Sequence, residues 1–552
     1  MTSSPGPLAP SAESLPALAD AVRDLADVLG ARLAAGARQH TTVAAQRAVL
    51  RAIGVTGVGS TGRPLALDVV ERLAATEPSL LASGIALPFA IAAHEYDLEP
   101  QQVATEIVEG NVDLAAEATL LSHRARSAPA RALLDAWLSE ADDRFDANAV
   151  ARAELATMLG EPRLPCVGVE ERTFDVRDAS VRARHAVRRG ADLVRVRIPR
   201  DGELRDDLGA IAPEDEWPVG SDAPAPTGSQ RGLSMLRTAL DEEGAIVGRA
   251  PRLGVRRVGL AAPEVAVVAG FERVDVVFVD PLEAIEQAAV DVDRALTDHA
   301  AADALLARTD VRLSLGCGSS IAIEVGTDVD GSDHDPAATD RADPGHGAAV
   351  SGRSLALQAL SRAFAIRAGF PPDRLDLAAC PPFAAHPDRP MRPLVEVALR
   401  TLLFPGHRLV VEREIAEAVG PGLPGLVAAW MAGRADLGIV FAAADDSVGG
   451  ALGDATPGLV GTAAASGRAL AACRSVGDLQ GEALDLAAAT LVEARRVLAE
   501  VERRGLGAVL GRASGLGARG LVRASDGDPG MAWVWGPERG GAGTRSRAGG
   551  SR

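Results

Sequence analysis

The stretch RLGVRRVGLAAPEVAVVAGFERVDVVFVD, residues 252–280, decides the fold of this chain. Two short runs rich in β-branched residues, 252–260 and 274–279, flank the segment PEVAVVAGF, which has a helical pattern. A strand followed by a helix and a second strand is typical of a parallel sheet, because the helix returns the chain to the same edge. The stretch therefore predicts one β–α–β unit.

The same alternation continues on both sides of this unit. Six more β-rich runs occur, at 165–170, 192–198, 311–316, 374–379, 408–412 and 436–442. Helical patterns fill most of the gaps between them, although Gly and Pro interrupt the segment 413–433. Eight strands that alternate with helices predict an α/β fold, a (β/α)8 TIM barrel.

Composition shifts divide the rest of the chain. Apolar residues at helical spacing predict an all-α region before the barrel and a helix after it, and Asp, Gly, Pro and Ser mark loops. The predicted organisation is a disordered start at 1–12, a helical N-terminal region at 13–160, the barrel at 161–445 with disordered inserts near 205–228 and 326–350, a C-terminal helical extension at 446–525 and a disordered tail at 526–552.

Charge and hydropathy exclude several classes of protein. The net charge of −18 argues against a nucleic-acid binder, which needs basic phosphate contacts. No run approaches the ~20 apolar residues that span a membrane. The start of the sequence has no basic segment followed by an apolar one, so no secretory signal is predicted and a cytoplasmic location is expected.

The chain contains no lysine, and arginine supplies every basic side chain. A guanidinium does not deprotonate near neutral pH, so no side chain here can form a Schiff base with a carbonyl cofactor. The four cysteines show no C-x-x-C spacing and are predicted to be small core residues in a reducing compartment. They are Cys166, Cys317, Cys380 and Cys473.

Barrel enzymes place their chemistry on loops after the carboxyl ends of the strands, and this rule ranks the candidate site residues. The ranked residues, in strand order, are Glu170, Glu171 and Arg172; Pro199 to Glu203; Arg256 and Arg257; Asp280 and Glu283; the GCGSS turn at 316–320; Cys380; Glu412 and Arg413; Asp445 and Asp446.

Two of these features, and also the acidic insert at 326–350, have simpler interpretations that we favour. Asp280 and Glu283 fit the capped first turn of a helix, with a proline at its first position. The GCGSS turn could bring backbone N–H groups to a phosphate, but an ordinary tight turn explains it as well. The acidic insert with His334 and His346 lacks the spacing of a calcium loop, so a solvated insert is favoured over a metal site.

Four segments in this order resemble the α subunit of lysine 5,6-aminomutase, which uses adenosylcobalamin and PLP to move an amino group between adjacent carbons. They are QHTTVAAQRAVLRAIGV (39–55), RRGADLVRV (188–196), RTALDEEGAIVGRAPRL (237–253) and GLAAPEVAVVAGFERVDVVFVD (259–280). The resemblance runs from about 38 to 520. It implies a small amino-acid substrate and a hetero-oligomer with a β subunit that carries the cobalamin domain and the PLP-binding lysine.

The resemblance also implies candidate cofactor contacts. In the loop after the second strand, Gly202 matches a family glycine, and Arg200 matches the family arginine after a shift. Ser319 stands at an asparagine position after the fifth strand. Arg200, Gly202 and Ser319 are therefore the cofactor-binding candidates, and no catalytic residue or metal ligand is assigned.

Other family positions differ. A PLP-contacting serine falls on Val258, a stacking tyrosine on Glu283 and an arginine on Ala288, whereas framework residues match. The matching framework residues are Pro263, Glu264, Glu272, Arg273, Asp275 and Asp280. Three interpretations stay open: a divergent but working aminomutase subunit, a catalytically silent scaffold or regulatory partner of a β subunit, and a barrel adapted to another substrate.

Overall fold

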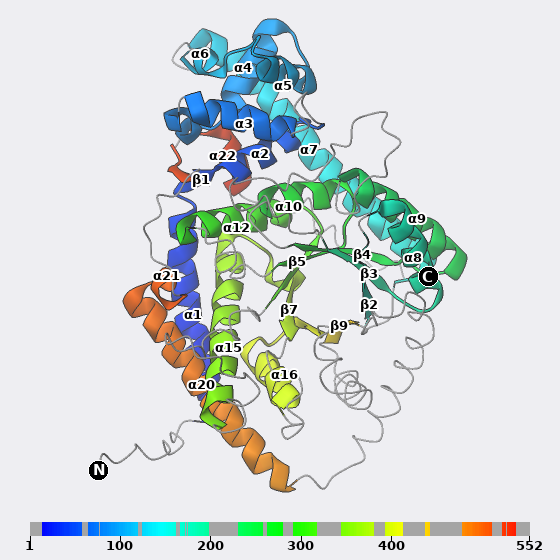
Figure 1. Cartoon of the computed structure of the whole chain (residues 1–552), viewed down its shortest axis with the longest axis vertical. Coiled ribbons are helices and arrows are strands. Elements are labelled where there is room, and N and C mark those ends of the chain that lie inside the picture. Colours follow the sequence, from blue (N-terminus) through cyan, green and yellow to red (C-terminus); the bar gives the residue numbers. More distant parts are fainter. Residues whose placement is uncertain are drawn as a thin grey trace, which may run out of the picture.

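Eight parallel strands form a closed barrel in the computed structural model (Figure 1). They are β2 (Cys166–Glu171), β3 (Leu193–Arg197), β4 (Arg252–Arg257), β5 (Val276–Val279), β6 (Arg312–Leu315), β7 (Leu375–Ala379), β8 (Arg408–Val411) and β9 (Leu437–Phe441). Each strand pairs with its sequence neighbour, and β9 closes on β2. Every predicted strand is present, so the (β/α)8 prediction is confirmed.

The structure describes residues 14–57, 64–76, 78–119, 124–161, 166–171, 173, 175–197, 230–257, 262–279, 291–316, 344–379, 392–411, 437–441, 477–510, 521–525 and 527–536. No helix in these ranges is long and apolar enough to cross a membrane.

Helices cover the outside of the barrel. They are α8 (Val176–Arg188), α9 (Gln230–Val247), α10 (Ala262–Phe271), α12 (Val292–Ala307), α15 (Pro344–Ala368) and α16 (Arg392–Leu403). Helices α1 (Leu15–Ala37) and α20 (Gly477–Arg504) run beside α15, so the first and last long helices form an extra layer on one side. The short α21 (Leu506–Val509) follows α20.

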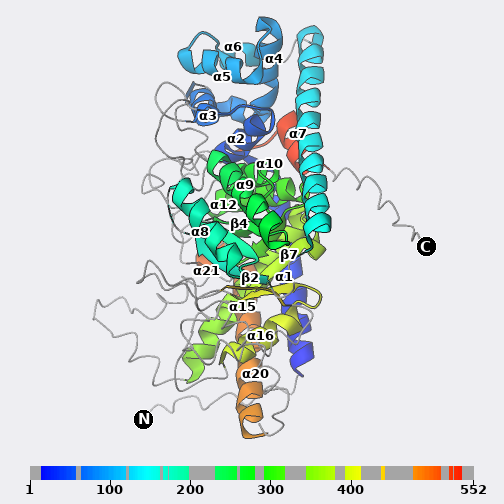
Figure 2. The ribbon, with the colours of Figure 1, turned by 90° about the vertical axis from the view of Figure 1, so that its right-hand side faces the viewer.

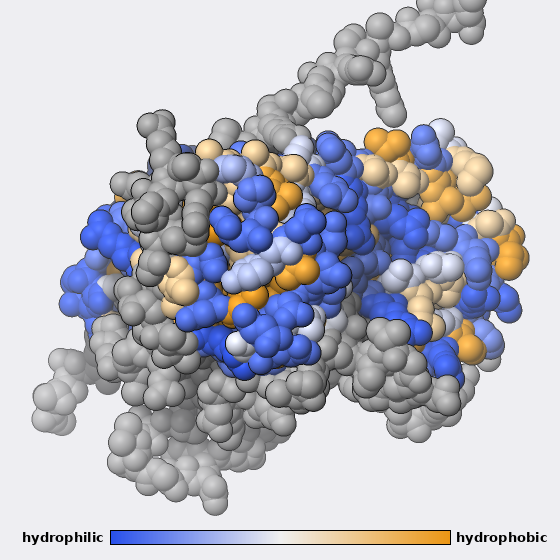
Figure 3. All heavy atoms as spheres, turned by 90° about the horizontal axis from the view of Figure 1, so that it is seen from above, coloured by the Kyte–Doolittle hydropathy of each residue, from blue (hydrophilic) through white to orange (hydrophobic). Residues whose placement is uncertain are grey.

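A second group of helices lies at one end of the molecule, on the outer side of α10 and α12, and is called here the helical cluster. It contains α2 (Val43–Ala52), α3 (Leu65–Thr76), η1 (Pro78–Ser83), α4 (Ala86–Tyr96), α5 (Pro100–Glu109) and α6 (Leu114–Thr119). The long α7 (Arg124–Leu159) runs from this cluster down the side of the barrel (Figure 2). Seen from above, this end shows a mostly hydrophilic surface with scattered apolar residues (Figure 3).

The C-terminal stretch joins the helical cluster. Strand β10 (Leu521–Arg523) pairs antiparallel with β1 (His40–Thr42), and α22 (Pro529–Trp535) packs against α2, α4 and α12. The structure thus corrects the prediction of a disordered tail from 526, because Met531, Trp533 and Val534 are buried there. The other predicted domain boundaries remain predictions.

Buried Asp528 explains why α22 is ordered. Its carboxylate accepts backbone N–H groups of Gly530 at 2.9 Å and Met531 at 3.1 Å, which caps the helix. Its other oxygen accepts the Gln46 side chain at 3.0 Å. Gly84 has a φ of +79°, and a Cβ there would lie 2.1 Å from this carboxylate, so only glycine fits.

Candidate active site at the carboxyl mouth of the barrel

Two charged layers face the inside of the barrel, and the one at the carboxyl ends of the strands is the candidate site. Glu170 on β2, Arg195 on β3, Arg256 on β4 and Phe278 on β5 come from four consecutive strands. The register pairs Glu170 with Arg195 and Arg256 with Phe278. Active sites of (β/α)8 enzymes lie at this mouth, so these four residues form the described part of the candidate site.

Arg195 is fully buried and its charge is balanced inside the site. It forms an ion pair with the buried carboxylate of Glu170. Its guanidinium carbon lies 4.9 Å from the centroid of the Phe278 ring, which is cation–π distance. Arg195 is therefore held in place from two sides.

Arg256 is the more accessible cation of the site. Its Nη1 lies 3.8 Å from Glu170 Oε2, and 28% of its side chain is exposed. The described mouth thus holds two guanidiniums and one carboxylate. The described part of the mouth therefore carries more positive than negative charge, which favours an anionic group that approaches from solvent.

Phe278 depends on a glycine in the neighbouring strand. A Cβ on Gly254 would lie 2.8 Å from the ring of Phe278. The ring therefore fills the space that a side chain on β4 would take. It packs in the barrel interior with Cys166, Leu193, Val276 and Val410.

The structure describes few of the ranked candidate residues. Glu170 and Arg256 both lie at the carboxyl mouth, 3.8 Å apart. The Glu171 carboxylate accepts the backbone N–H of Thr173 at 2.8 Å, so it shapes the turn after β2. The prediction that Cys166 is a free core residue is confirmed: it is fully buried.

The remaining candidates lie outside the described residues. They are Arg172, Pro199 to Glu203 with Arg200 and Gly202, the side chain of Arg257, Val258, Asp280, Glu283, Ala288, Cys317 to Ser320 with Ser319, Cys380, Glu412, Arg413, Asp445, Asp446 and the acidic insert up to 343. Arg200, Gly202 and Ser319 therefore stay predictions.

Sequence reasoning missed Arg195 and Phe278 because it searched the loops after the strands and not the strands themselves. The missed signal is the alternation in LVRVR (193–197), which puts Arg195 on the same face as Leu193. In a barrel that face is the interior, so a buried arginine there requires a partner.

The framework residues of the resemblance stabilise the fold instead of forming the mouth. Glu264 on α10 accepts Arg47 of α2 at 2.7 Å and lies 3.5 Å from Arg51, and all three are buried. Thr42 donates to Asp298 on α12 in the same region. These contacts join the helical cluster to the barrel.

Asp275 has a similar structural role at the amino end of β5. Its Oδ2 accepts the backbone N–H of Leu253 at 2.7 Å and lies 3.1 Å from Arg237, while its Oδ1 binds Arg152 of α7 at 2.8 Å. Asp275 thus ties two strands to α9 and α7. Burial lowers the pKa of Arg237 to about 10, which still leaves it charged near neutral pH.

A closed (β/α)8 barrel defines the class of the protein: it is a TIM-barrel protein, with paired charges at the carboxyl mouth of the barrel. Residues 16–329 match the family described as the D-lysine 5,6-aminomutase TIM-barrel domain of alpha subunit. This match covers more than half of the chain, and the chain belongs to that family.

Two curated relatives agree with this assignment. The chain is 28% identical over 261 residues to the lysine 5,6-aminomutase alpha subunit of Fusobacterium nucleatum subsp. nucleatum. It is 29% identical over 261 residues to the alpha subunit of the same name from Acetoanaerobium sticklandii. Each match covers 47% of this chain and 48% of the relative, so it spans about half the length of the curated relatives.

Proposed function

We propose that this chain supplies the barrel of an aminomutase that moves an amino group between adjacent carbons of lysine or a related amino acid. Membership of the aminomutase family carries the proposal. The cationic carboxyl mouth supports it, because an amino-acid carboxylate or a cofactor phosphate is an anion that such a mouth attracts. The proposed cofactors are adenosylcobalamin and PLP.

The net positive charge of the described mouth suits the negative phosphate of PLP. Arg256 is the residue that we propose to hold it, because it is a cation open to solvent beside an already paired Arg195. When bound, PLP supplies the carbonyl chemistry that holds the migrating nitrogen. Glu170 and Phe278 would keep Arg195 fixed, so the charge at the floor of the mouth does not move during the reaction.

The sequence contains no lysine, so no side chain in it can join PLP as an imine. We propose that a cobalamin-binding β-type subunit provides the lysine that joins PLP, in a cytoplasmic hetero-oligomer. Co-expression followed by size-exclusion chromatography tests this proposal. A single complex is expected, and two separate peaks across a range of concentrations would contradict it.

The isolated chain should bind PLP weakly or not at all. The family's stacking ring falls on Glu283, and its serine and arginine fall on Val258 and Ala288. Each lost hydrogen bond to a charged phosphate forfeits roughly 1.5–3 kcal/mol, and every 1.4 kcal/mol is about tenfold in affinity. An absorbance titration that saturates at low micromolar PLP, and that Arg200→Ala or Ser319→Ala abolishes, would show a rebuilt site on this chain.

The same three positions favour a second candidate function, a silent scaffold or regulator of the β-type subunit. The decisive measurement is amino-group migration by the purified complex with both cofactors. Turnover that Arg256→Ala reduces supports the working enzyme. A stable complex without turnover on lysine and related amino acids supports the scaffold.

A further inference from the structure

A layer of arginines lies at the amino end of the barrel, opposite the candidate active site. Four alternate strands contribute one inward side chain each at the same level: Cys166 on β2, Arg252 on β4, Arg312 on β6 and Arg408 on β8. This level follows from the strand register, since barrel layers take their side chains from alternate strands. Arg252 Nη1 lies 3.5 Å from Cys166 Sγ, which confirms that the layer is contiguous.

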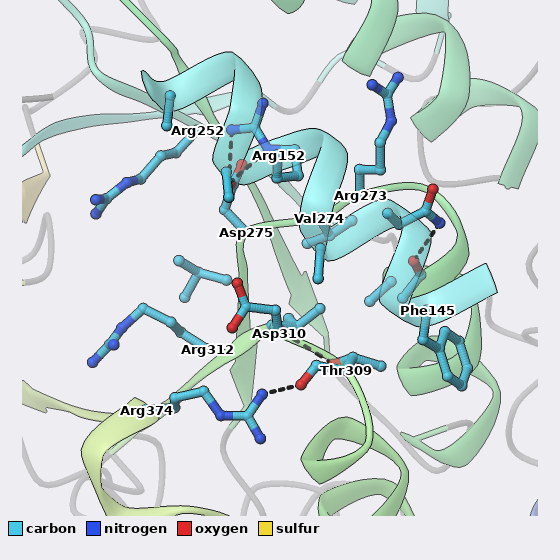
Figure 4. Close-up of a pocket in the computed structure, with 18 of the residues that line it drawn as sticks. Phe145, Arg152, Arg252, Arg273, Val274, Asp275, Thr309, Asp310, Arg312 and Arg374 are labelled. Carbon is cyan, nitrogen blue, oxygen red and sulfur yellow. Dashed lines mark hydrogen bonds and ion pairs between the residues drawn. The ribbon is translucent and has the colours of Figure 1, made fainter. Parts of the chain in front are cut away.

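This amino-end layer borders a cavity of about 290 Å³. Arg252, Arg312 and Arg408 all line it, and Asp310 lies in its wall. Figure 4 shows Arg252 and Arg312 extending toward the same side of the cavity. The three guanidiniums therefore share one small space that solvent-borne molecules of modest size can enter.

The positive charge of this layer exceeds the negative charge around it. Asp376 binds Arg312 through two contacts, at 2.6 Å and 3.0 Å, and so neutralises one guanidinium. Within the part of the chain that the structure describes, no carboxylate lies within ion-pair distance of Arg252 or Arg408. Arg252 and Arg408 thus make no direct ion pair there, and Asp192 and Asp376 attract them only from a greater distance.

The other arginines of the cavity are already engaged. Arg152 binds Asp275 at 2.8 Å, and Arg273 binds Asp241 at 3.1 Å. Arg374 donates to the backbone carbonyl of Ala307 at 2.8 Å. Arg252 and Arg408 are therefore the two arginines of this cavity for which the described residues show neither a carboxylate nor a carbonyl contact.

Such an excess is unfavourable unless an anion balances it. A guanidinium stays protonated in proteins, and removing a charge from water without a partner is costly. The pKa of Arg408 is lowered first by burial and then by the neighbouring Arg312, and Asp376 offsets this only in part. The net effect disfavours the charged form of Arg408.

We propose that the amino end of the barrel binds a dianionic phosphoryl group, as inorganic phosphate or as a small phosphate monoester, between Arg252, Arg312 and Arg408. Planar guanidiniums match the oxygens of phosphate in pairs, and two positive charges that contact no carboxylate suit its two negative ones. The cavity volume accommodates a phosphate ester of a few carbons. This site is independent of the proposed cofactor site at the other mouth.

The test is calorimetric titration of inorganic phosphate, and separately of glycerol phosphate, into the full chain at constant ionic strength. Saturable binding is expected for the wild-type chain. Arg252→Gln and Arg408→Gln should each weaken it about tenfold or more. The ligand that binds more tightly identifies whether free phosphate or an ester occupies the site.

Two matched controls locate the binding. Arg273→Gln removes the same charge from the same cavity but from an arginine that Asp241 already pairs, and it should leave the affinity within about twofold of wild type. Arg256→Gln shows whether the titrated phosphate binds at the opposite mouth instead, where we propose that Arg256 holds the phosphate of PLP. A loss of binding in Arg256→Gln alone would assign the phosphate to the cofactor site and overturn the proposal.

A second measurement keeps the proposal testable if a variant folds poorly. Phosphate should raise the thermal midpoint of the wild-type chain more than chloride does at equal ionic strength, and this difference should vanish in Arg252→Gln and Arg408→Gln. Equal shifts by chloride, equal affinity in all variants, or no saturable binding would each overturn the proposal.

Discussion

Arg47 lies completely inside the protein, and Glu264 lies beside it. Their 2.7 Å contact, with Arg51 at 3.5 Å from the same carboxylate, joins α2 to α10. Removing one partner of a buried pair leaves an uncompensated charge, which costs about 3–5 kcal/mol. We expect Glu264→Ala to lower the free energy of unfolding by this amount in urea denaturation.

The control for Glu264→Ala is an ion pair on the surface. Glu493 on α20 contacts Arg496 at 2.7 Å, and 62% of the Arg496 side chain is exposed. Solvent screening limits such a pair to roughly 0.2–1 kcal/mol. If Glu493→Ala costs as much as Glu264→Ala, the buried network is not what joins the two regions.

Asp303 gives a pH-dependent prediction at the same scale. Only 6% of this α12 residue is exposed, and burial raises its pKa well above the ordinary value. The folded state therefore binds a proton that the unfolded state releases, so stability is greatest below the unfolded pKa of about 4 and falls as pH rises.

Asp303→Asn should remove this loss of stability at higher pH, because an amide does not ionise. We expect the thermal midpoint of the variant to exceed that of the wild type at pH 7 and to approach it at pH 4. The exposed Asp485→Asn on α20 is the control and should change neither value. A higher thermal midpoint for the wild type than for Asp303→Asn at pH 7 would contradict this prediction. It would show that the folded protein stabilises the ionised Asp303 carboxylate.

At the scale of the element, β4 and β5 pack together because Gly254 on β4 has no side chain and leaves room for the Phe278 ring. Gly254→Ala would place a Cβ 2.8 Å from the Phe278 ring, and overpacking of this kind costs typically 1–3 kcal/mol. Denaturation should show this loss in Gly254→Ala. The double variant with Phe278→Leu should recover part of it, because the smaller side chain makes room.

A glycine on α1 provides the comparison. A Cβ added at Gly36 would meet no other atom within 4 Å, and the residue lies in a helix, so Gly36→Ala should stabilise the protein by about 0.5–1 kcal/mol. A destabilised Gly36→Ala, or a Gly254→Ala variant that Phe278→Leu does not improve, would contradict the steric explanation.

Strands and helices with a clear periodic residue pattern could be predicted from the sequence. The charged side chains inside the barrel could not. All eight strands follow from short apolar runs between helical patterns. Period two fixes which residues share a face, but it does not say that arginine faces inward, because polar residues usually face water. Arg195 and the amino-end layer of Arg252, Arg312 and Arg408 were missed for this reason.

Helix α22 was missed although its signal is present. Asp528 before Pro529 is a capping pair, and Met531 and Val534 have helical spacing. The glycine-rich sequence that follows this short segment indicated a disordered tail instead. Its order depends on Gln46 and Gly84, which are distant in sequence, so local pattern alone could not establish it.

At the scale of the whole molecule, the C-terminal stretch completes the helical cluster. A chain truncated after residue 520 loses β10 and α22 and should expose the buried faces of α2 and α4. We expect limited proteolysis to cleave it within residues 43–119. Truncation after 536 removes only the sequence beyond α22 and should leave the wild-type cleavage pattern.

The pairing of β1 with β10 also constrains the order of events during synthesis. Residues 40–119 leave the ribosome before the barrel, but the strand and helix that cover them are translated only after the barrel. At 5–20 residues per second, the cluster waits roughly tens of seconds for its final partners. During that interval its apolar faces are available to chaperones, so nascent chains stalled before residue 521 should be captured by them and released chains should not.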